Sequence, residues 1–61
     1  MMKYKVKAKR KGERRMRVVY DGKCMSMMIS TAARMCNSDD VTECEVTITD
    51  YYGKEEVERC K

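Results

Sequence analysis

The sequence predicts an α+β domain in which two β-hairpins bracket a single helix, in the order β-β-α-β-β. Residues 2–9 and 41–49 alternate apolar and polar side chains with a period of two, which is typical of half-buried strands. Residues 24–36 instead repeat apolar side chains at helical spacing. We expect a four-stranded antiparallel sheet with one helix packed on one face, and a chain of 61 residues leaves room for one domain, residues 1–61.

The first hairpin is expected to join a strand at residues 2–9 to a strand at about residues 13–20. A three-residue hairpin loop favours Gly at its third position, which the segment Arg10-Lys11-Gly12 provides. This register places Val6 opposite Met16, so that apolar side chains meet across the pair. Asp21-Gly22 is expected to end the second strand.

The helix is predicted over residues 24–36, with Asn37 as its C-cap. At 100° per residue its apolar face comprises Met25, Met28, Ile29, Ala32, Met35 and Cys36. The opposite face carries Met27 and Arg34. Because Met27 is apolar on a face where a polar residue would favour solubility, Met27 and Arg34 are candidates for contact with a protein partner.

The second hairpin is predicted from residues 41–49 and a short fourth strand at residues 54–60. Asp50 and Gly53 occupy the first and fourth positions favoured in a type I turn. A four-residue loop would place Val46 opposite Val57 on the inner face and Glu45 opposite Glu58 on the outer face. A slip of one residue would change every partner.

The composition predicts a thin core, because the chain has no Leu, Phe, Trp or Pro and has seven Met. A domain of this size often needs an additional source of stability, and we expect it to form a homodimer. No apolar run reaches the roughly 18 residues of a membrane span, and the first residues lack the apolar stretch of a secretory signal. We therefore expect a cytoplasmic protein with no membrane partner, whose cysteines stay thiols.

Charge divides the chain into a basic front and an acidic back. Residues 1–35 contain eleven Lys and Arg and two acidic residues, a net charge of +9. Residues 36–61 contain three basic and eight acidic residues, a net charge of −5, which gives the total of +4. Under the expected first register, lysines and arginines lie opposite one another on the outer face, and such like-charge pairs are destabilising. Anionic groups should offset them.

Two sources of that negative charge lead to different functions. In the first, the second hairpin lies beside the first, and its carboxylates at Glu43, Glu45, Glu56 and Glu58 neutralise the lysines within the sheet. In the second, the basic residues around the first turn extend beyond the acidic hairpin and bind phosphate groups of nucleic acid. The candidate nucleic-acid-binding residues are Lys9, Arg10, Lys11, Arg14, Arg15 and Arg17.

Catalytic and metal-binding motifs are not evident in the sequence. There is no His, no glycine-rich phosphate loop and no nucleophile beside a base, so we expect no enzyme and no cofactor. Cys24, Cys36, Cys44 and Cys60 include no C-x-x-C pair, and a four-thiolate zinc site would have to be assembled from remote positions. The simpler expectation is no metal, with Cys36 and Cys44 buried as small apolar residues. A Cys44–Cys60 disulfide remains an alternative, because a register shifted by one residue would bring them together.

These observations leave two hypotheses for a small non-enzymatic binding module. The first is contact with nucleic acid or another polyanion through the basic first hairpin. The second is a protein-interaction module, an adaptor or small inhibitor, that uses its helix face or an unpaired strand edge. Small modules of this kind are often encoded by phages and mobile elements, an analogy that rests on size alone.

Overall fold

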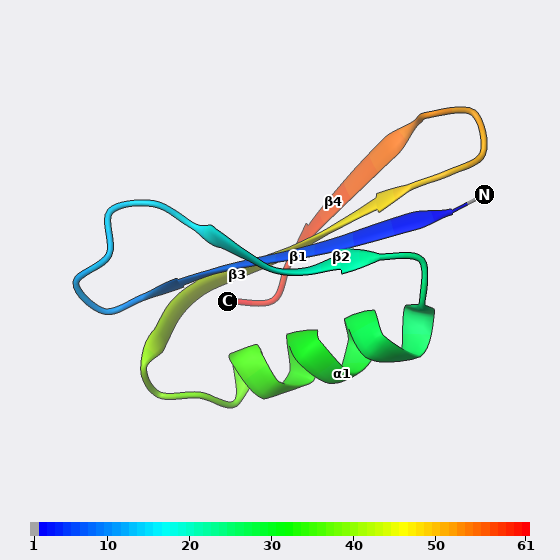
Figure 1. The fold of residues 1–61 in the computed structure, drawn as a ribbon. Helices are drawn as coiled ribbons and strands as arrows, with labels where there is room; N and C mark the ends of the chain where they lie inside the picture. The colour runs from blue at the N-terminus through cyan, green and yellow to red at the C-terminus, as the bar shows by residue number, and fades with distance from the viewer. Residues whose placement is uncertain (1) are drawn as a thin grey trace.

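A computed structural model describes residues 2–61 and contains four strands and one helix in the predicted order (Figure 1). All strand pairs are antiparallel and form one sheet with the order β2-β1-β3-β4. The predicted α+β fold is therefore confirmed. The elements are β1 (Lys3–Arg10), β2 (Arg17–Gly22), α1 (Met25–Cys36), β3 (Val41–Thr49) and β4 (Glu55–Arg59).

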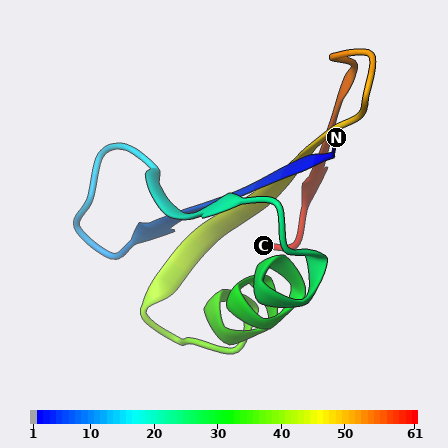
Figure 2. The same cartoon turned by 45° about the vertical axis from the view of Figure 1, so that its right-hand side comes forward.

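The helix covers one face of the sheet and leaves the other open to solvent (Figure 2). It packs against β1, β2 and β3, whereas β4 lies beyond its reach in the described part of the chain. The hydrophobic core lies between α1 and the two central strands. Its buried members are Tyr4, Val6, Ala8, Met28, Val41 and Cys44.

The buried stripe of α1 is narrower than its sequence suggests. Met28 and Thr31 are buried, but Met25 and Ile29 are 52% and 55% exposed, although both were expected on the core side. The helix rests on three strands only, so side chains on its flank extend past the sheet surface into solvent. Asn37 caps the helix as predicted, and its N–H donates to the Ala33 carbonyl over 3.1 Å. None of the described helices has the length and hydropathy needed to cross a membrane.

The first hairpin forms in a different register from the predicted one. The Arg10 carbonyl accepts the Glu13 N–H over 3.1 Å, and Gly12 has φ +85, so a tight turn does form around Lys11-Gly12. Residues 13–16 then leave the ladder, and pairing resumes at Arg17, opposite Ala8. A bulge follows, and it places Tyr20 rather than Met16 opposite Val6.

Charge explains why the longer loop is preferred. The predicted register places Lys7 opposite Arg15 and Lys5 opposite Arg17, which are repulsive pairs. In the structure Lys5 lies opposite Asp21, and Lys7 lies opposite a valine. The strand therefore continues through Asp21 and Gly22 instead of ending before them.

Gly22 also shapes the connection to the helix. A Cβ atom at this position would lie 2.6 Å from the Tyr20 hydroxyl oxygen, so a larger residue would displace that side chain. The same oxygen accepts the Cys24 N–H over 3.0 Å at the start of α1. Tyr20 thus supplies a cap for the helix, which Cys24 does not provide with its own side chain.

The second hairpin is shifted by one residue from the prediction. The Asp50 carboxylate accepts N–H groups from both Tyr52 and Lys54 over 2.9 Å, which extends the turn to residues 50–54. Val57 consequently lies opposite Thr47 on the outer face and is 57% exposed, whereas Val46 lies opposite Glu58. The shift removes the predicted Glu45–Glu58 pair and places Arg59 opposite Glu45.

Candidate functional site

The basic loop at residues 11–16 projects from one end of the sheet, away from α1 and β4 (Figure 1). Its base is held by the Lys11 N–H, which donates to the Asp40 carbonyl over 2.9 Å, and by the Arg10 N–H, which donates to the Glu13 carboxylate over 2.9 Å. The Lys11 bond ties the first turn to the segment that precedes β3, and the Arg10 bond closes the turn on itself. The loop is therefore anchored at its base.

Three of the six candidate nucleic-acid-binding residues already form ion pairs. Lys9 contacts Glu43 over 2.9 Å, and Arg10 contacts Asp40 over 3.0 Å. Arg17 contacts Glu13 over 2.7 Å but keeps 79% of its side chain exposed. Acidic groups thus reach the turn more closely than the sequence suggested, because Asp40 lies in the loop before β3 rather than on a strand.

The other three candidates, Lys11, Arg14 and Arg15, are exposed and form no ion pair with any residue in the range 2–61. A shallow hollow at this end of the molecule is lined by Gly12, Glu13, Arg14, Arg15 and Arg17. Three of these residues are arginines, whose guanidinium groups can each make bidentate contacts with a phosphate or carboxylate. Negative charge at the hollow comes from Glu13, which Arg17 already offsets.

Glu43 links three strands on the outer face of the sheet. One carboxylate oxygen accepts from Lys9 of β1 and the other accepts from Arg59 of β4 over 2.7 Å. Hydrogen bonds from Lys9 and then from Arg59 hold the pKa of Glu43 below its ordinary value of 4.5. The hydrogen bond to Glu43 in turn raises the pKa of Arg59.

The remaining lysines of β1 are only partly offset within the sheet. Lys7 lies opposite Glu45 of β3, and Lys5 lies between Asp21 and Thr47. By register, Glu56 and Glu58 fall on the helix side of the sheet, away from these lysines. The hypothesis that the second hairpin neutralises the lysines within the sheet therefore holds for Glu43, which pairs with Lys9, and for Glu45, which lies opposite Lys7. It does not hold for Glu56 and Glu58.

The two candidate protein-contact residues, Met27 and Arg34, are both exposed on α1. They lie on one flank of the helix by spacing, seven residues or about two turns apart. Met25 and Ile29 are exposed on the other flank. The two flanks are separated by the buried stripe and do not form one continuous apolar surface.

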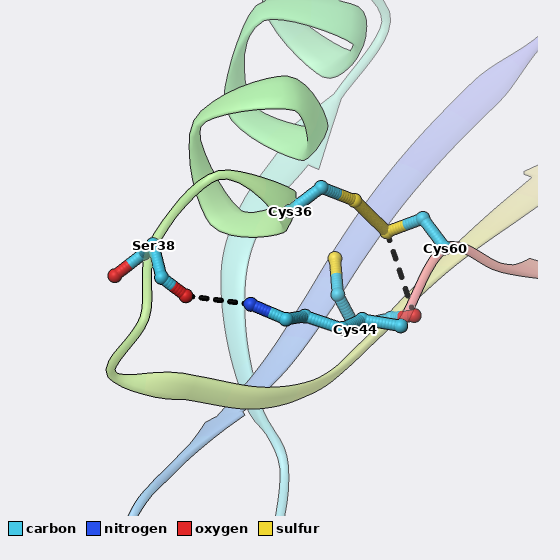
Figure 3. Close-up of a disulfide and its surroundings, with 5 residues drawn as sticks. Cys36, Ser38, Cys44 and Cys60 are labelled. Carbon is cyan, nitrogen blue, oxygen red and sulfur yellow. Dashed lines mark hydrogen bonds between the residues drawn. A yellow bond between two sulfur atoms is a disulfide. The ribbon is translucent and has the colours of Figure 1, made fainter.

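A cluster of three cysteines lies where the end of α1 meets β3 and the chain that follows β4 (Figure 3). Cys36 and Cys60 form a disulfide, which replaces both the expected free thiols and the Cys44–Cys60 alternative. The Cys44 side chain points toward this bond and is fully buried. Burial raises the pKa of the Cys44 thiol, an effect that Lys61 partly opposes.

Sequence reasoning did not find this cluster because its members are separated by seven and fifteen residues. The sequence did offer one indication, because a second-hairpin register shifted by one residue brings Cys60 beside Cys44. The Cys60 N–H donates to the Cys44 carbonyl over 3.0 Å, which confirms that Cys60 lies beside Cys44. The position of Cys36 follows only from the packing of the helix end onto β3.

The chain matches no protein-family model, and comparison with the curated proteins and the solved structures found no match.

Proposed function

We propose that this protein is a small non-enzymatic module that binds nucleic acid through its basic loop, residues 11–16, together with Arg17. The observation that carries the proposal is the exposure of Lys11, Arg14 and Arg15 without acidic partners among residues 2–61. Their cations lie together on one projecting loop, where a phosphate backbone can approach without contact with α1. Arg17 adds a guanidinium whose side chain stays exposed despite its pairing with Glu13.

The expected mode of binding is contact with the phosphate backbone rather than reading of bases. Arg and Lys contacts to phosphates position a protein on nucleic acid but carry little sequence information. Tyr4 and Tyr20 lie on the core side of the sheet, so the loop has no aromatic platform for stacking among the described residues. We therefore expect weak sequence preference and strong dependence on salt.

The test is a binding titration with a short labelled DNA duplex. Three phosphate contacts give a slope of about −2.7 in a plot of log affinity against log salt, which is roughly a 40-fold loss between 50 and 200 mM salt. Changing Lys11, Arg14 and Arg15 together to Ala should abolish this binding. The matched control changes Lys3, Lys23 and Lys54 to Ala, which removes the same charge from exposed positions elsewhere.

The control separates a local site from a general effect of net charge. If the loop is the site, the control variant keeps most of the affinity and the loop variant loses it. Equal losses in the two variants would show that only net charge matters, and unchanged affinity in the loop variant would overturn the proposal.

A second candidate function is protein contact through α1, favoured by the exposure of Met27 at 52%. The same proposal includes a cytoplasmic homodimer, which would form through a flank of α1 or through the free edges of β2 and β4. Met27→Glu and Arg34→Glu should then remove a partner that survives nuclease treatment, or reduce the dimer to a monomer in light scattering. A partner that disappears with nuclease would count against this candidate.

A further inference from the structure

We propose that, in the reduced chain, Cys36, Cys44 and Cys60 form a three-thiolate site for Zn²⁺. The three sulfur atoms lie within 4.8 Å of one another. Three sulfurs bound to one zinc ion at about 2.3 Å lie roughly 3.8–4.0 Å apart. The Cys44 sulfur therefore needs to move by only about 1 Å, while the other two separate after reduction.

The three ligands come from three neighbouring segments of the fold. Cys36 is the last residue of α1, Cys44 lies within β3, and Cys60 directly follows β4. The Cys60 N–H donates to the Cys44 carbonyl, and the Cys60 sulfur lies 3.6 Å from that carbonyl oxygen. The Cα atoms of Cys36 and Cys60 are 6.3 Å apart. The backbone bond thus holds Cys60 beside Cys44 whether or not the disulfide is present, and the packing of α1 on β3 keeps Cys36 near them.

Charge balance favours Zn²⁺ over a monovalent thiophilic ion. Three thiolates and Zn²⁺ carry a net charge of −1, whereas the same thiolates with a monovalent ion carry −2. Lys61 supplies one compensating positive charge that acts on Cys44, and its ammonium group donates to the Ser38 carbonyl over 2.6 Å. Because Cys44 is fully buried, the complex with the smaller residual charge is favoured.

Reduction must come before zinc binding. An external dithiol supplies two electrons and two protons to the Cys36–Cys60 bond and is itself oxidised to a disulfide. Zn²⁺ then displaces three thiol protons, one from each cysteine, and a water molecule can occupy the fourth coordination position. A reducing compartment maintains the thiol state that this site requires.

Cys24 provides a matched control within the chain. It is exposed at the N-cap of α1, about 18 Å along the helix from Cys36 at 1.5 Å per residue. It cannot reach the cluster from that position. A variant at Cys24 removes one thiol without touching the proposed site.

The test is a zinc titration of the reduced chain without oxygen, in competition with a chromophoric chelator and after removal of the reductant. We expect one Zn²⁺ per chain, release of three protons, and no zinc binding by the oxidised chain. Cys36→Ser, Cys44→Ser and Cys60→Ser should each weaken binding at least about a hundredfold, whereas Cys24→Ser should not change it. Circular dichroism checks that each variant is folded.

A second readout uses the unmodified sequence and does not depend on how the variants fold. Alkylation followed by mass spectrometry should find only Cys24 modified in the zinc-bound chain and all four cysteines modified after chelation and unfolding. Absence of zinc binding, one zinc per two chains, modification of Cys44 in the zinc-bound chain, or full affinity in Cys44→Ser would each overturn the proposal.

Discussion

At the residue scale, Glu43 is the acidic side chain that most directly neutralises positive charge on the sheet. It accepts from Lys9 and Arg59 and so connects β1 and β4 through β3. The contacts lie at the surface, where ion pairs contribute little stability individually. Their larger effect is on pairing, because they favour the register in which Glu43 lies opposite Lys9.

Glu43→Gln should make the protein slightly less stable at neutral pH. The pKa of Glu43 is lowered in the folded state, so its stabilising effect is present above the ordinary value of 4.5 and is lost as the pH falls through the folded pKa. We expect the Tm difference between the two proteins to be present at about pH 7 and to vanish in acid. Thermal unfolding measured across this pH range checks it.

The matched control for that experiment is Glu56→Gln, since Glu56 is exposed on β4 and forms no ion pair within residues 2–61. It should show no such pH-dependent difference. A Tm difference for Glu43→Gln that persists below the folded pKa would contradict the role given to its carboxylate.

At the element scale, the order and the approximate positions of strands and helix follow from the sequence, but the registers do not. Periodicity placed the 41–49 strand and the helix correctly, and residue type identified the Asn37 cap. Both hairpin registers were wrong because they were assigned from the turn residues and the apolar pattern, and the like-charge pairs they create were expected to be offset by other groups rather than avoided by a change of register. In each hairpin, the observed register replaces a like-charge pair by a neutral or opposite-charge one.

The shifted second register has a measurable consequence at Val57. Because this side chain is exposed on the outer face, Val57→Thr should change the free energy of unfolding by no more than about 0.5 kcal/mol. The same substitution at Val41, which is 1% exposed, should cost about 1–3 kcal/mol because it buries a hydroxyl group. Urea denaturation measures both values. A large loss of stability from Val57→Thr would instead support the predicted register, in which Val57 lies opposite Val46.

At the scale of the whole molecule, a small core is supplemented by one covalent link. The Cys36–Cys60 disulfide joins positions 24 residues apart and fastens the end of the chain to the helix. Among residues 2–61, six hydrophobic residues are buried, so a link of this kind adds appreciably to the total stability. It also connects the acidic hairpin to α1, against which β4 itself does not pack.

Reduction of the disulfide in metal-free buffer should lower the free energy of unfolding by about 3 kcal/mol, as expected for a closed loop of this length. For a chain of this size that corresponds to a fall in Tm of more than about 10 °C. Thermal scans with and without a dithiol measure the change. Cys24→Ser should leave the oxidised Tm unaltered, and an equal Tm before and after reduction would show that the link is not stabilising.

The candidate site was predictable in part at this scale. The charge division of the sequence pointed to the first turn, and the loop that carries Lys11, Arg14 and Arg15 does project from the sheet. The sequence did not reveal that Arg10 pairs with Asp40 or Arg17 with Glu13, because those contacts depend on loop geometry and on a segment thirty residues away. Fewer lysines and arginines around the first turn are therefore available to bind an anion than the composition suggests.

The most direct test of the proposed function is a map of amide chemical shifts during titration with a DNA duplex at low salt. Binding through the basic loop predicts that the largest changes fall within residues 10–17 and fade as salt is added. The signals of Met27, Arg34 and β4 should hardly move. Largest changes on α1 or β4, or no change anywhere at low salt, would contradict the claim that this loop binds nucleic acid.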